Sequence, residues 1–213
     1  MTKIKELPSK ISVFPLSNFI IFPNTSVPLN IFEPRYIKMV DDSMKSNRII
    51  GMIQPKNQRN NQPELYSIGC AGKITNFDET EDGRYLIVIK GISRFKILKE
   101  INNDKVYREC EVDFKAYNND IIESEKEIKS NELELIFKNL QSLFEKKGYT
   151  INWKELEKQS LDQTINTLSM ASPFSLEEKQ VLLETMDINN RKIELEKILT
   201  TYSVDEFNNK TIQ

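Results

Sequence analysis

Catalytic chemistry in this chain has to proceed without histidine, because none of its 213 residues is a histidine. Ser-His-Asp and Cys-His nucleophiles and all His-ligated zinc sites are therefore excluded. No G-x-x-x-x-G-K-[ST] phosphate loop, G-x-G-x-x-G dinucleotide fingerprint or G-x-S-x-G motif occurs. Serines near lysines lie in polar stretches, whereas a Ser-Lys pair needs a desolvated lysine. The sequence thus predicts no enzyme activity, no cofactor and no metal site.

The carboxylates and thiols do not change this prediction. The acids at 78–82 surround a predicted hairpin turn, and solvated acids make poor general acids. Asp41 and Asp42 are adjacent on a predicted helix and so point in different directions, which suits a divalent ion poorly. Cys70 and Cys110 lie in apolar, strand-like segments and are predicted to be buried small hydrophobes.

Composition limits the partners. The 32 acids and 30 bases give a net charge of −2, which disfavours nucleic acid as the main partner. The N-terminus lacks the apolar stretch of a signal peptide, and the longest wholly apolar run covers residues 85–89, far short of the ~20 needed to span a bilayer. We therefore expect a cytoplasmic protein without a membrane partner.

The chain divides by pattern into residues 1–115 and 116–213. All glycines but Gly148 and all prolines but Pro173 precede residue 92. The first part predicts a closed or nearly closed barrel of short strands with one helix, beginning at Pro34, that plugs one end. The strands are predicted at 11–16, 27–32, 49–53, 66–77, 85–90, 93–98 and 107–114, with turns at Asn24, at Asp82-Gly83 and at Gly91-Ile92.

The second part has helical periodicity and predicts an α-helical bundle. Apolar residues between 133 and 144 share one helix face, and Gly148 follows as the C-terminal cap. Capping-box spacings start three further helices, at Asn152, Ser160 and Ser175. In a last helix over 190–202, Ile193, Ile198 and Leu199 are predicted to point inward. Residues 1–115 hold 18 bases and 14 acids, and residues 116–213 hold 12 bases and 18 acids, so the two parts carry +4 and −6.

The densest group of candidate site residues lies where the second strand meets the first helix. Phe32 and Tyr36 are aromatic, and Glu33 stands near a helix N-terminus, where a carboxylate is favoured. Arg35 can pair with Glu33 or with another acid. Two interpretations remain open here: a corner that fixes the plug helix, or the edge of a binding groove.

Several blocks in order resemble the N-terminal domain of Lon proteases. The first block is Phe14-Pro15-Leu16, Phe22-Pro23 and the run from Val27 to Met39, and the second is Ile68 to Ile74. Asp82 to Tyr85 and Gly91 to Ile97 are similar to the third and fourth, and Pro173 to Glu184 is similar to the family's late helix. The resemblance covers about residues 8–200 and implies an α+β fold, a PUA-like β-barrel followed by a helical bundle. Asn24 stands where the family commonly has glycine.

The resemblance also implies a function. In Lon this region precedes an ATPase and a Ser-Lys protease module and helps to select substrates, and this chain resembles the standalone bacterial proteins with that domain alone. We therefore expect a non-catalytic module that binds unfolded or client polypeptides, or a full-length Lon protease. Candidate binding residues are Phe32, Glu33, Arg35, Tyr36 and, in the fourth block, Arg94. The alternatives are RNA binding, as in other PUA-like barrels, and a small-molecule sensor like a distantly similar domain in cereblon.

Overall fold

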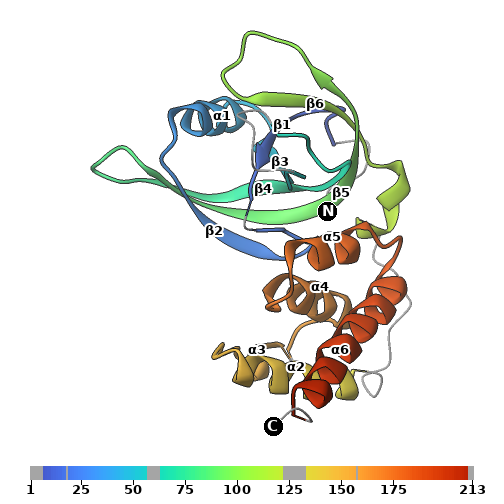
Figure 1. The fold of residues 1–213 in the computed structure, drawn as a ribbon. Coiled ribbons are helices and arrows are strands. Elements are labelled where there is room, and N and C mark those ends of the chain that lie inside the picture. The colour runs from blue at the N-terminus through green and yellow to red at the C-terminus, as the bar shows by residue number, and fades with distance from the viewer. Residues whose placement is uncertain (1–6, 18, 57–62, 122–132, 157, 211–213) are drawn as a thin grey trace. The chain divides into compact units, whose positions relative to one another are not determined.

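Two compact units make up the chain, Met1–Glu123 and Ser124–Gln213. The computed structural model describes residues 7–17, 19–56, 63–121, 133–156 and 158–210. The division follows Glu123, not the 115/116 boundary expected from pattern. The short 3-10 helix η2 (Lys115–Asp120) packs on strand β5 (Tyr85–Ile101), which keeps it in the first unit (Figure 1).

The first unit is built on a mixed six-stranded sheet. Its strands are β1 (Lys10–Pro15), β2 (Ser26–Ile31), β3 (Ile49–Ile53), β4 (Ile68–Glu79), β5 and β6 (Arg108–Asp113). The order is β2-β5-β4-β3-β1-β6, and β5 also pairs with β6, so five strands close into a ring and β2 lies outside it beside β5 (Figure 1). Strands β1 and β3 pair in parallel, which requires the crossover through β2 and helix α1 (Pro34–Met44) that separates them in the chain.

Strand β5 contains a bulge in its pairing with β4. The prediction of a turn at Gly91 and Ile92, and hence of seven strands, is wrong, because both residues lie within one continuous strand. Gly72 pairs with Gly91 while the residue before it pairs with Ser93, so Ile92 is an extra residue in the ladder. A β-carbon on Gly91 would lie 2.1 Å from the carbonyl oxygen of Phe22. Glycine is therefore needed for a close approach of two backbones rather than for a turn.

Other predictions for the first unit are confirmed. Helix α1 begins at Pro34, as predicted, and buries Tyr36, Met39 and Val40. Asn24 has a φ of 60°, and Gly83 has a φ of 77° in the hairpin turn between β4 and β5. Both cysteines are free and buried. One cluster of buried residues in this unit consists of Ile11, Val13, Ile49, Ile53, Ala71, Phe95, Cys110, Val112 and Phe114.

Helices form the described part of the second unit. They are α2 (Glu134–Lys146), α3 (Trp153–Leu156), α4 (Leu161–Ala171), α5 (Leu176–Glu184) and α6 (Ile188–Lys210), and α6 packs against α2, α4 and α5. Ser175 makes both hydrogen bonds of a capping box with Glu178, and Ser160 accepts the first-turn bond predicted for it. None of the described helices is long and apolar enough to cross a membrane.

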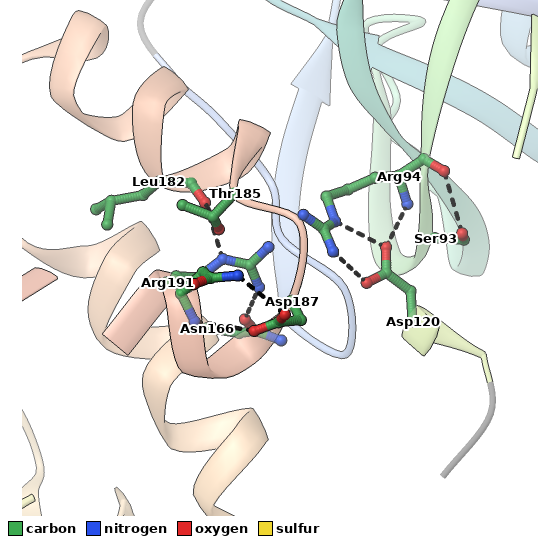
Figure 2. A network of polar contacts seen from close by, with 9 residues as sticks. Ser93, Arg94, Asp120, Asn166, Leu182, Thr185, Asp187 and Arg191 are labelled. Carbon is green, nitrogen blue, oxygen red and sulfur yellow. Dashed lines mark hydrogen bonds and ion pairs between the residues drawn. The ribbon is translucent and has the colours of Figure 1, made fainter. Parts of the chain in front are cut away.

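The inward face of α6 includes a charge. Ile198 and Leu199 are buried as predicted, but Ile193 is 49% exposed, so that prediction is wrong. The inward position two turns before Ile198 belongs to Arg191, which is 1% exposed. Its Nε donates to the carbonyl oxygen of Leu182 at 2.9 Å, and its Nη1 donates to the side-chain oxygen of Asn166 (Figure 2). Arg191 therefore connects α6 to α5 and α4. A search for apolar residues at helical spacing misses this position because arginine is charged.

Candidate functional site

The corner between β2 and α1 exposes an aromatic ring. Ile31 ends β2 with its side chain buried, and the next residue, Phe32, is 64% exposed. Glu33 has an extended backbone, as a residue before proline favours, and Pro34 then opens α1. Since successive side chains of an extended chain alternate in direction, burying Ile31 points Phe32 outward.

The remaining residues of the corner fix its geometry. Tyr36 is 6% exposed, and its ring centroid lies 4.3 Å from that of Phe14 on β1. The Arg35 guanidinium stacks 4.5 Å from the centre of the Tyr36 ring and donates from Nε to Glu33 at 2.9 Å. Burial raises the pKa of the Tyr36 hydroxyl, and the neighbouring Arg35 charge opposes that rise. Tyr36 is therefore an anchor of α1, whereas Phe32, Glu33 and Arg35 face solvent.

Arg94 does not join this corner. It lies nine residues along β5 from Tyr85, the partner of Ile31, which is about 30 Å of extended strand. Its side chain is 1% exposed and pairs with Asp120, whose side chain is 7% exposed. Asp120 oxygens accept from the Arg94 backbone N at 2.8 Å, from Nε at 2.9 Å and from Nη2 at 2.8 Å (Figure 2). Asp120 could not be found from the sequence, because 26 residues separate it from Arg94 and no local spacing connects them.

The two adjacent acids of α1 hold the helix in place. Asp41 accepts from the Tyr85 hydroxyl at 3.0 Å, and Asp42 accepts from the Tyr107 hydroxyl at 2.9 Å. The hydrogen bond from Lys38 is the largest cause of the lowered pKa of Asp42, opposed by burial and aided by Tyr107. Within the described ranges, no group of three or more His, Cys, Asp or Glu side chains is placed to hold a metal ion.

An α+β fold with a mixed sheet and a helical second unit defines the class of this protein. The chain belongs to the family of ATP-dependent protease La (LON) substrate-binding domains, whose model matches residues 10–201. It is 25% identical over 205 residues to the Lon protease of Dictyoglomus thermophilum, covering 90% of this chain and 24% of that protein. It is 26% identical over 206 residues to the Lon protease of Flavobacterium johnsoniae, covering 89% and 24%. The chain thus spans about a quarter of the length of these relatives.

Solved structures with the same fold are similar to it. One is a Lon N-terminal domain protein from Xanthomonas campestris, with a TM-score of 0.66 and 21% identity over 91% of this chain and 98% of that one. Another is the N-terminal domain of a Mycobacterium avium complex Lon protease, with a TM-score of 0.62 and 18% identity over 90% and 98%. At these identities the likeness establishes the fold.

Proposed function

We propose that this chain is a non-catalytic module that binds polypeptides, with a full-length Lon protease as a candidate partner. Its first unit is then a PUA-like barrel plugged by α1, and its second a helical bundle. The family is described as a substrate-binding domain, which supports the class of function. The observation that carries the proposal is the exposed ring of Phe32 at a corner where Tyr36 packs on Phe14.

Phe32 suits a polypeptide anchor for two physical reasons. A ring that is 64% exposed has most of its apolar area still available for burial by a partner. The packing of Tyr36 on Phe14 holds the corner in place before binding, which reduces the conformational entropy that binding would cost. The exposed Glu33–Arg35 ion pair supplies the polar rim typical of an interface around an aromatic anchor.

The absence of catalysis is part of the proposal. The chain holds no histidine to act as a general base. Burial lowers the pKa of Lys179, the change that a Ser-Lys pair would need, but its Nζ donates to the carbonyl oxygen of Met170 at 2.8 Å. That lysine therefore fixes the end of α4 instead of activating a hydroxyl. The two free buried cysteines support a reducing, cytoplasmic compartment.

Replacing Phe32 tests the proposal. We expect Phe32→Ser to weaken binding of an unfolded, carboxymethylated client protein by at least about tenfold in fluorescence anisotropy, because aromatic anchors dominate interface energies. The matched control is Leu98→Ser, which removes a 61% exposed apolar side chain from β5 of the same unit. Equal binding by wild type and Phe32→Ser, or equal loss in both variants, contradicts the assignment of Phe32.

A further inference from the structure

One face of the sheet beside the corner is exposed along three neighbouring strands, β2, β5 and β4. In β2, Val27 and Ile31 are buried, so the alternate residues Ser26, Pro28 and Asn30 share the opposite face and are exposed. The register places Lys90, Val88 and Leu86 of β5 directly opposite these three residues. We call this the outer face of β2 and β5.

Two like charges stand opposite each other at one end of the outer face. Lys90 of β5 pairs in register with Lys73 of β4, and both side chains are exposed. Like charges directly opposite on antiparallel strands destabilise a sheet, because their Cβ atoms are only about 5 Å apart. Neither side chain makes an ion pair with any residue that the structure describes. The two ammonium groups therefore present an uncompensated positive charge to solvent.

Two apolar side chains of β5 follow the lysine pair on the outer face. Val88, half-buried, lies between Pro28 and Asn76, and Leu86, 43% exposed, lies between Asn30 and Asp78. Successive pairs on one face are about 7 Å apart, so the lysine pair and Leu86 span on the order of 14 Å, the length of a five-residue extended segment. No aromatic side chain stands in these rows, so the face lacks the stacking platform that a single-stranded nucleic acid would use.

The free edge of β2 borders this face. Among the described strands β2 pairs with β5 alone, so its other edge has no partner. Pro28 has no N–H, and its place in the ladder puts that missing donor at the free edge, as strand prolines require. An added strand can thus pair with the backbone of Ser26 and Asn30 but not with a donor between them. Because Pro28 interrupts the row of backbone donors, discrimination between polypeptide sequences has to come mostly from side chains.

From this juxtaposition we infer that the outer face of β2 and β5 selects extended polypeptide segments that carry acidic residues at one end of an apolar stretch. Carboxylates of the segment pair with Lys73 and Lys90, and its apolar residues cover Leu86 and Val88. The inference rests on the proposed function and adds to it the class of polypeptide that is bound. Charge complementarity argues for this occupant, because an acidic segment relieves the repulsion within the lysine pair.

Two peptide probes test the inference. One is an eleven-residue capped peptide with two Glu followed by alternating Leu and Ser, and the other has two Lys in place of the Glu. We expect wild type to bind the acidic peptide about tenfold more tightly, with a preference that falls as salt rises. Lys73→Gln/Lys90→Gln should reduce the preference to about twofold, with a melting temperature equal to or above that of wild type because the repulsion is gone.

The matched control removes the same charge elsewhere. Lys96→Gln/Lys99→Gln changes two exposed lysines of β5 beyond the bulge, and we expect it to keep the preference for the acidic peptide. Equal affinity of wild type for both peptides, or equal loss in the two double variants, overturns the inference. So does tighter binding of mixed-sequence single-stranded RNA that Lys73→Gln/Lys90→Gln abolishes, which assigns the pair to nucleic acid.

The outcomes also separate this inference from the proposed function. If both peptides bind equally and Phe32→Ser weakens both, polypeptide binding stands and the charge preference fails. If neither peptide nor an unfolded client protein binds wild type, the proposed function fails as well.

Discussion

Removing the carboxylate of Asp120 should be among the most damaging single changes to the first unit. The Arg94 side chain is 1% exposed, and Asp120 accepts two hydrogen bonds from it and one from the Arg94 backbone N–H, at 2.8–2.9 Å. The guanidinium also lies 4.1 Å from the centre of the Tyr117 ring. Asp120→Ala leaves this buried cation without its carboxylate, and breaking one partner of a buried ion pair costs about 3–5 kcal/mol.

That cost is a large fraction of the stability of a domain, which is typically about 5–15 kcal/mol. Equilibrium unfolding in urea measures it, with tyrosine fluorescence weighted towards the first unit, which holds five of the seven tyrosines, and the single tryptophan, Trp153, reporting the second. The matched control is Glu33→Ala, which breaks an ion pair whose side chains are 49% and 43% exposed and should cost under about 1 kcal/mol.

A double variant distinguishes the ion pair from the cavity left by the lost side chain. Arg94→Met/Asp120→Ala should be less destabilised than the sum of the single variants, because no unpaired charge stays buried. A loss below about 1 kcal/mol for Asp120→Ala would refute the reasoning, as would strict additivity in the double variant.

Two further predictions concern the interior of the same unit. Burial raises the pKa of the Cys110 thiol to about 11 from 9.0, so at pH 8 an aromatic disulfide reagent should modify Cys110 far more slowly in the folded protein than in urea, and equal rates contradict this. Because the folded pKa is the higher one, the folded state binds more protons between pH 9 and 11, so the contribution of this thiol to the free energy of unfolding falls as pH rises through that window. Gly91→Ala should prevent native packing, because its β-carbon would lie 2.1 Å from the Phe22 carbonyl oxygen; a melting temperature within a degree of wild type excludes that clash.

Local chemistry allowed several elements to be predicted from sequence. Pro34 starts α1 because its fixed φ suits a first helical turn, and Ser175 with Glu178 starts α5 because each satisfies a free backbone N–H of the other. Gly83 and Asn24 take positive φ because their neighbours require a turn there. These features depend on residues within a few positions of one another, and so a sequence displays them directly.

The site depended on longer-range geometry. Sequence identified Phe32 and Tyr36 as a pair of aromatics, but only the packing of Tyr36 on Phe14 shows that one is an anchor and the other is exposed. Sequence left open whether Arg35 pairs with Glu33 or with another acid. The structure pairs it with Glu33, and the exposure of that ion pair limits its contribution to stability. Arg35 therefore contributes less to the stability of the fold than an arginine in a buried ion pair would.

Sequence alone determined the α+β class, the absence of histidine chemistry and the start of most helices, because composition and short-range spacing carry that information. Tertiary structure decided that Gly91 sits in a bulge rather than a turn, since the Phe22 carbonyl that excludes a side chain comes from a distant segment. It also decided that Lys73 and Lys90 face each other, because strand register is set by the packing of buried faces and not by the exposed residues themselves.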